Sequence, residues 1–250
     1  MPQLPTICIT GATDGLGLAL ARIYQSRDAR LILVGRRALH TLDPATFTAA
    51  TYCQADLRQP AAVAAIAAFL AYQGLDRLDL LIHNAGVGYY GPVEKQSPAS
   101  INEIIGVNVE APIALSHALL PWLERSRGKI VLISSLAAAL PVPDYAVYGA
   151  SKAALDGFAR SLRVELAGRV AVQVIHPGAI RTGMHAKLGD GHAPIDTRRF
   201  PAVEQVAPLV ARAISGRRRA VTIGGLNSLV WLAGTYAARP LDWLLKRRRR

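Results

Sequence analysis

The sequence predicts an α/β protein: a doubly wound, seven-stranded parallel sheet flanked by helices, within a single domain. Short apolar runs alternate with longer helical patterns almost from end to end, which is typical of right-handed β–α–β units. Most of these runs are apolar on both faces, as in buried parallel strands. The strands are expected at residues 4–10, 30–35, 51–54, 78–84, 129–135, 170–176 and 220–224.

The helical patterns fill the intervals between these runs, except between the second and third strands. The chain there is short, so we expect a stunted helix. In sheets of this kind ligands bind beyond the carboxyl ends of the strands, so the residues that follow each strand are the first candidates for a site. Helices are expected near 15–26, 60–73, 98–124, 146–167 and 203–215.

Composition excludes several classes of protein. The 250 residues are 51% hydrophobic and only 18% charged, which excludes a disordered chain. Cys8 and Cys53 lie in apolar runs without metal-ligand spacing and are expected to be buried, reduced thiols. We see no secretory signal before the first strand, which favours the cytoplasm. No metal site and no nucleic-acid-binding signature is evident.

The net charge of +12 is unevenly distributed along the chain. The clusters "GRRRA" at 216–220 and "KRRRR" at 246–250 carry eight of the 29 Lys and Arg residues. Such clusters indicate a polyanionic partner or a membrane surface, and the alternative is a solvated tail.

The first strand runs directly into "TGATDGLG" at 10–17, and a helix follows. Glycines at this point allow a tight turn whose backbone N–H groups approach a pyrophosphate at the helix N-terminus, although a plain strand-to-helix turn would look similar. The candidate cofactor contacts are Gly11, Thr13, Asp14, Gly15, Leu16 and Gly17.

The second strand ends at "VGRR". An acidic residue usually binds the ribose 2′-OH of NAD at this point, but this chain has Arg36 and Arg37. Guanidinium groups suit a 2′-phosphate, so the pair favours NADP, with two solvated arginines as the alternative. After the third strand, Asp56 and Leu57 are placed to meet an adenine ring.

Three further strand ends carry candidate residues. The fourth ends in "HNAG", with Asn84, Ala85 and Gly86, where a dinucleotide would need close approach. The fifth ends at Ser135. The sixth leads into "HPGAIRT", a tight turn suited to the nicotinamide half of a cofactor, and its candidate contacts are Pro177, Gly178, Ile180 and Thr182.

"YGASK" at 148–152 places Tyr148 and Lys152 on one face of a helix. A fixed ammonium beside a phenol would lower the phenol's pKa and make it a usable acid and base. By itself the pair could equally be a polar helix face.

Together these motifs resemble the short-chain dehydrogenase/reductase family of the NADP-preferring type. The resemblance spans about residues 5–182 and includes the Asn of "GVNVEAP" and a Ser thirteen residues before the Tyr. It implies a Rossmann fold and a homodimer or homotetramer. Asp14 departs from the basic residue of many NADP-preferring members, and His83 departs from the first Asn of their NNAG motif. The implied catalytic tetrad is Asn108, Ser135, Tyr148 and Lys152.

The resemblance also implies roles for these residues. Tyr148 would exchange the proton with the substrate oxygen, which Ser135 would hold. Lys152 would bind the nicotinamide ribose and lower the pKa of Tyr148, and Asn108 would hold a water linking Lys152 to solvent. Besides this NADPH-linked oxidoreductase, the alternative is a catalytically weak NADP(H)-binding sensor on the same fold.

The substrate itself is not evident, but its surroundings are. Ser135, Tyr145 and Tyr148 are the expected substrate contacts. The segment after the sixth strand carries Met184, Leu188 and Ile195, which suggest a lipophilic ketone or secondary alcohol.

We expect a catalytic domain at residues 1–225 and a helical, basic extension at 226–250. Leu226, Leu229, Val230, Leu232 and Ala233 recur at helical spacing, and a second short helix would follow Pro240. Apolar residues beside a basic cluster suit peripheral membrane association. The alternative is that the extension packs on the protein.

Overall fold

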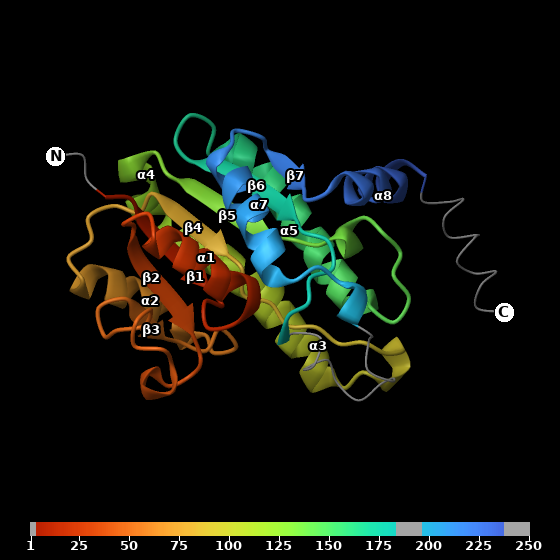
Figure 1. Cartoon of the computed structure of the whole chain (residues 1–250), viewed down its shortest axis with the longest axis horizontal. Helices are drawn as coiled ribbons and strands as arrows, with labels where there is room; N and C mark the ends of the chain where they lie inside the picture. Colours follow the sequence, from red (N-terminus) through yellow and green to blue (C-terminus); the bar gives the residue numbers. More distant parts are fainter. Residues whose placement is uncertain (1–3, 184–196, 238–250) are drawn as a thin grey trace.

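A parallel sheet forms the centre of the molecule, and helices cover both of its faces (Figure 1). The computed structural model describes residues 4–183 and 197–237. Within that part of the chain, seven parallel strands lie in the order β3-β2-β1-β4-β5-β6-β7, which confirms the predicted fold. The strands are β1 Thr6–Thr10, β2 Arg30–Gly35, β3 Tyr52–Gln54, β4 Leu80–His83, β5 Lys129–Ile133, β6 Ala171–His176 and β7 Ala220–Thr222.

The central strands are apolar throughout because both of their faces are covered. All five residues of β1 are buried. Successive side chains point to opposite faces, so Ile7 and Ile9 join one core cluster while Cys8 joins the other. The two hydrophobic clusters on either side of the sheet fix the register of each strand.

Helices α1 and α7 cover one face of the sheet, whereas α2, α4 and α5 cover the other. Helix α8 follows β7 at one end of the molecule (Figure 1). The α-helices are α1 Gly15–Gln25, α2 Ala61–Tyr72, α3 Pro98–Ile105, α4 Ala111–Ser126, α5 Ala146–Glu165, α7 Val203–Ser215 and α8 Gly225–Tyr236. Short 3₁₀ turns are η1 Leu39–Thr41, η2 Val93–Lys95, η4 Leu136–Ala138 and η5 Thr197–Arg199, and η3 Gly106–Glu110 is a π-helical turn.

The helix predicted near 98–124 is interrupted by the π-helical turn η3, where the N–H of Ala111 donates to the carbonyl of Gly106. Among the described residues, Pro98–Ser126 is the one helix whose length and apolar composition would also suit a membrane span. Its leucines at 115, 119 and 123 are fully buried against the sheet, as expected of a core helix.

The short connection between β2 and β3 contains only η1, which confirms the expected stunted helix. Phe47 and Tyr52 cover this part of the sheet instead, with their ring centroids 5.5 Å apart in an edge-to-face arrangement. The Tyr52 hydroxyl donates to the carbonyl of Arg37 at 2.6 Å and so fixes the chain as it leaves β2.

Several strands end earlier than predicted. β4 ends at His83 and β5 at Ile133, so Asn84, Ser134 and Ser135 lie beyond the strands and line a cleft. Helix α8 confirms the helical spacing seen after residue 225. The second helix expected after Pro240 and the apolar segment containing Met184, Leu188 and Ile195 lie outside the described residues.

Candidate functional site

A cleft of about 860 Å³ opens at the carboxyl ends of β1, β2, β3, β4, β5 and β6. This is the edge at which parallel sheets bind their ligands. Of the predicted site residues, Gly17, Arg37 and Asn108 do not line it, and all the others do. The structure therefore brings together candidates from six different strand ends.

The glycine turn after β1 is shaped for close approach by a phosphate group. Gly11 and Gly15 have positive φ angles of 65° and 51°, which favour glycine, and Asp14 caps α1 by accepting from the Gly15 N–H at 2.7 Å. Gly17 allows contact within the turn, since a Cβ there would overlap the carbonyl of Gly11. This cradle at the N-terminus of α1 fits a dinucleotide pyrophosphate.

Asn84 braces the glycine turn through its side chain. Both N–H groups of its amide are used, donating to the carbonyls of Thr10 and Gly11 at 3.1 Å each. The buried Thr10 hydroxyl in turn accepts from the backbone N–H of Asn84 and of Ala85, also at 3.1 Å. The sequence analysis missed Thr10, although its place directly before the first glycine was the available signal.

The end of β2 separates the two predicted arginines. Arg36 lines the cleft, whereas the guanidinium of Arg37 donates to the carbonyl of Thr41 at 3.0 Å, outside the cleft lining. This geometry does not support Arg37 as a cofactor contact. Two residues that the sequence analysis missed, Arg58 and Glu103, line the cleft beside Arg36.

Ser135 and Tyr148 both line the cleft. Burial raises the pKa of Tyr148, and the neighbouring Ser135 side chain partly opposes that rise. The Lys152 ammonium lies 5.8 Å from the centre of the Tyr148 ring and donates to the carbonyl of Ile133 at 2.9 Å.

The predicted lowering of the Tyr148 pKa by Lys152 is not found: desolvation is the largest influence on this pKa, and the opposing one comes from Ser135. Burial also lowers the pKa of Lys152 to about 8, and the carboxylate of Asp156 opposes that change. Near neutral pH the ammonium form of Lys152 still predominates.

Asn108 is fully buried behind the cleft. Its amide oxygen accepts from the Val87 N–H at 2.9 Å, and its amide nitrogen donates to the Val87 carbonyl at 2.9 Å and to the Ser151 hydroxyl at 3.0 Å. The side chain thus ties the chain after Gly86 to α5. Because its amide groups already make these hydrogen bonds, a water held by Asn108 would bind to the backbone of this residue.

Two histidines that follow strands are structural in character. His83 contacts the Ser116 hydroxyl at 2.9 Å, and burial lowers its pKa to about 3, so it is neutral. His176 pairs with Asp156 at 2.7 Å and lies 5.2 Å, ring to ring, from Trp231 of α8. Within residues 4–183 and 197–237, no cluster of His, Cys, Asp or Glu is placed to hold a metal.

The side of the cleft beyond Tyr148 is aromatic and apolar. The ring of Tyr145 lies 5.6 Å from that of Tyr148 and 5.1 Å from that of Tyr90. Tyr145 was predicted from the sequence, but the other apolar residues of this wall were not; they come from η4, from the chain between η4 and α5, and from the residue after η5. The additional apolar lining residues are Leu136, Leu140, Val142, Pro143 and Phe200.

The turn after β6 closes the opposite side of the cleft. Pro177, Gly178, Ile180 and Thr182 all line it, as predicted. A Cβ on Gly15 would lie only 3.2 Å from the Thr182 side chain, so this turn lies directly against the glycine turn.

A glycine cradle, with Ser135, the buried Tyr148 and Lys152 in the same cleft, is typical of an oxidoreductase that uses a nicotinamide cofactor. The chain belongs to the short-chain dehydrogenase/reductase family, whose short chain dehydrogenase model matches residues 5–193.

Relatives and solved structures agree with this assignment. Dehydrogenase/reductase SDR family member 7B of Bos taurus is 35% identical over 206 residues, which are 74% of this chain and 61% of that protein. A short-chain dehydrogenase from Sphingobium yanoikuyae in complex with NADPH is 27% identical with a TM-score of 0.78, covering 98% of this chain and 94% of the other. A Burkholderia phymatum short-chain dehydrogenase/reductase in complex with NAD is 25% identical with a TM-score of 0.77, covering 91% and 92%.

Proposed function

We propose that this chain reduces a lipophilic ketone to a secondary alcohol, or catalyses the reverse reaction, with NADP(H) as its cofactor. The observation that carries the proposal is the placement of Ser135, the buried Tyr148 and Lys152 together in one apolar-walled cleft. The bound nicotinamide would supply or accept the hydride.

Tyr148 and Ser135 have different roles toward the substrate oxygen. Tyr148 donates a proton to that oxygen during reduction and removes it during oxidation. The raised pKa of Tyr148 keeps the phenol protonated in the free site, ready for reduction. Ser135 donates a hydrogen bond to the same oxygen and fixes its position. Lys152 binds the ribose hydroxyls through its ammonium group. When the cofactor binds, this group would exchange its hydrogen bond to the Ile133 carbonyl for bonds to the ribose.

Cofactor preference rests on Arg36. The family includes members bound to NADPH and members bound to NAD, so family membership does not decide between the two. Arg36 lines the cleft with half of its side chain exposed, so its guanidinium is accessible to a 2′-phosphate.

Arg36→Ala should weaken NADPH binding about tenfold or more while changing NADH binding less than about twofold, because only NADPH carries the phosphate. Titration of cofactor fluorescence measures both dissociation constants. Equal losses for the two cofactors would show that Arg36 does not read the 2′-phosphate.

The substrate class rests on the wall around Tyr145. Apolar and aromatic residues make up most of this side, and Ser135 and Tyr148 lie next to it. A pocket of that kind favours a carbonyl compound with a large apolar remainder.

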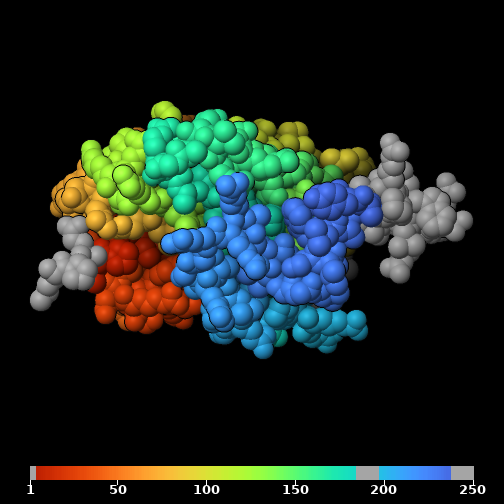
Figure 2. Space-filling model, turned by 90° about the horizontal axis from the view of Figure 1, so that it is seen from above, coloured from red at the N-terminus to blue at the C-terminus, as the bar shows by residue number. Residues whose placement is uncertain are grey.

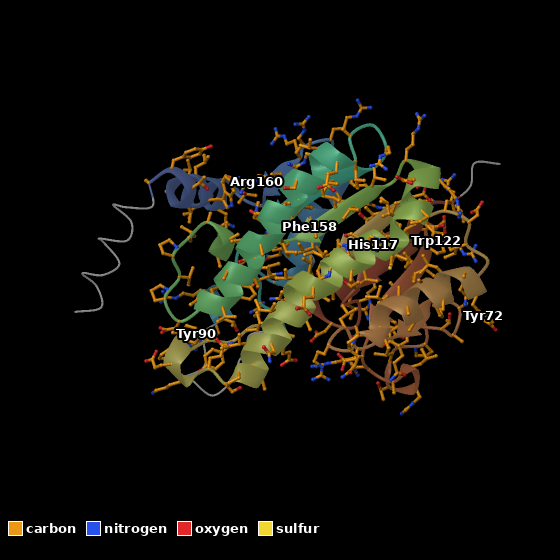
Figure 3. The ribbon with its side chains drawn as sticks, turned by 180° about the vertical axis from the view of Figure 1, so that it is seen from behind. Tyr72, Tyr90, His117, Trp122, Phe158 and Arg160 are labelled. Atoms are coloured by element: carbon orange, nitrogen blue, oxygen red, sulfur yellow. The ribbon has the colours of Figure 1, made fainter. Side chains whose placement is uncertain are left out.

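We also propose a homodimer or homotetramer formed through the outer face of α4 and α5. Figure 3 shows these helices side by side, with His117 and Trp122 on α4 and Phe158 and Arg160 on α5. Light scattering should give the mass of two or four chains at micromolar concentration. A mass of one chain would contradict this proposal.

We also propose that this chain is a cytoplasmic enzyme that binds membranes peripherally through helix α8. Its apolar side chains at Leu226, Leu229 and Tyr236 are exposed at 75%, 65% and 82%, at one end of the molecule (Figure 2). Among residues 216–250 the sequence has one acidic residue, Asp242, against nine basic ones. Exposed apolar area beside positive charge suits an anionic bilayer.

The full chain should co-sediment with phosphatidylserine-containing vesicles at low salt, and not with vesicles of phosphatidylcholine alone. Leu226→Ser/Leu229→Ser should reduce that binding about tenfold, since it removes apolar area without changing charge. Tyr72→Ser, at an exposed position at the end of α2, is the control. Equal binding by both variants would exclude α8 as the anchor.

A further inference from the structure

Four charged side chains gather at the end of the cleft beyond β2 and β3. Arg36, Asp56, Arg58 and Glu103 all line this end, and their formal charges cancel. They come from three separate segments, since Glu103 lies on α3 and the others follow β2 and β3. This end of the cleft is therefore less positive than its two arginines alone would make it.

The two carboxylates are held very differently. Asp56 accepts from Arg58 through both of its oxygens, with Nε 2.9 Å from each, and this bond holds the pKa of Asp56 below its usual range. Glu103 makes looser contacts: its Oε1 lies 3.9 Å from Nη1 of Arg36 and 3.7 Å from Nη1 of Arg58. One oxygen of Glu103 thus faces both guanidinium groups at distances too long for strong hydrogen bonds.

A 2′-phosphate would be a better partner for this pair of cations. It carries a charge near −2 and three acceptor oxygens, whereas Glu103 offers one negative charge at long range. Arg36 is the residue that our proposed function assigns to the 2′-phosphate, so phosphate and Glu103 would face the same guanidinium group. The two like charges would then repel each other.

We propose that Glu103 determines cofactor specificity by competing with the 2′-phosphate for Arg36 and Arg58. Glu103 faces both guanidinium groups in the free enzyme, and the 2′-phosphate replaces it there when NADP(H) binds. This inference rests on the proposed use of NADP(H). Glu103 would therefore weaken NADP(H) binding and leave NAD(H) binding unchanged. Asp56 does not compete in this way, because both of its carboxylate oxygens are hydrogen-bonded to Arg58.

Glu103 could instead favour NAD binding, and this second role predicts a different effect of removing its charge. A carboxylate at this end of the cleft could accept from the ribose 2′-OH of NAD, in which case its removal would weaken NAD binding. The two roles therefore predict changes in different ligands and of different sign.

The test is calorimetric titration of the full chain with adenosine 2′,5′-bisphosphate and with adenosine 5′-monophosphate, which differ only in the 2′-phosphate. Glu103→Gln should bind the bisphosphate about three- to tenfold more tightly and the monophosphate within about twofold of the wild type. Because the charges are partly exposed, the gain should shrink as salt is raised from low to about 0.5 M.

Glu110→Gln is the matched control, since it removes a carboxylate from an exposed site on the same helical stretch that does not line the cleft. It should leave both affinities unchanged. Unchanged bisphosphate affinity in Glu103→Gln, or weaker monophosphate binding, would overturn the inference. If instead Arg36→Ala weakens both ligands equally, the proposed 2′-phosphate site fails rather than the role of Glu103.

Discussion

Replacing Tyr148 with Phe is expected to lower kcat for ketone reduction by about 10²- to 10⁴-fold, the usual contribution of a positioned acid or base. The variant loses only the phenolic hydroxyl, and the buried ring keeps its contact with Tyr145. NADPH affinity should change by less than about threefold, because neither the glycine turn nor Arg36 contacts this hydroxyl. Stopped-flow kinetics with parallel binding titrations would separate the two effects.

A matched control is Tyr24→Phe, which also removes a buried phenolic hydroxyl. That hydroxyl has no hydrogen-bond partner among the described residues, and Tyr24 lies on the buried face of α1, outside the cleft lining. Its removal should leave activity unchanged. If Tyr148→Phe retains more than about a tenth of wild-type activity, Tyr148 is not the proton donor.

Gly17→Ala is expected to abolish cofactor binding, with a loss of at least about 100-fold in affinity. A Cβ at this position would overlap the Gly11 carbonyl and lie 2.5 Å from the amide nitrogen of Asn84, so the turn itself must shift. Because Asn84 bonds both Thr10 and Gly11, that shift would distort the whole cradle. The free energy of unfolding should also fall by about 1–3 kcal/mol.

Gly157→Ala separates this effect from a general effect of adding a methyl group. Gly157 also lies within a helix, α5, but a Cβ there would have no heavy atom within 4 Å. This change should raise the free energy of unfolding by about 0.5–1 kcal/mol and leave cofactor binding intact. Urea denaturation and calorimetry would measure both variants. If Gly17→Ala binds NADPH as the wild type does, the turn does not cradle the cofactor.

The sheet was predictable because each strand can be recognised from a short stretch of consecutive residues. Each strand is a short apolar run with a helix pattern after it, and Cys8 between Ile7 and Ile9 shows how burial of both faces gives such runs. The ends of β4 and β5 were less predictable. Asn84 and Ser135 leave the strand ladder to make side-chain bonds, and apolar patterning does not show where that happens.

The tetrad was predicted through the family resemblance: Tyr148 and Lys152 have helical spacing and Ser135 follows a strand, whereas Asn108 lies in the GVNVEAP motif, which forms the turn η3. The role of Asn108 was harder to foresee, since its amide is satisfied by Val87 and Ser151, and only the folded chain brings those groups to it.

The charged end of the cleft was the part that sequence reasoning missed. Glu103 lies 67 positions after Arg36, on a helix whose pattern predicts only an amphipathic surface. Only the folded chain brings Glu103 of α3 within 4 Å of the Arg36 and Arg58 side chains, and no short motif encodes that proximity. Similarly, the pairing of His176 with Asp156 depends on α5 packing against β6.

The most direct test of the central claim is deuterium transfer. NADPH deuterated at the transferable C4 position would be incubated with the full chain and a series of ketones of increasing apolar size, and the products analysed by mass spectrometry. We expect one deuterium on the carbinol carbon of the alcohol, transferred most rapidly to the larger apolar ketones and not by Tyr148→Phe. Binding of NADPH without deuterium transfer to any ketone in the series would contradict the assignment of this chain as a carbonyl reductase.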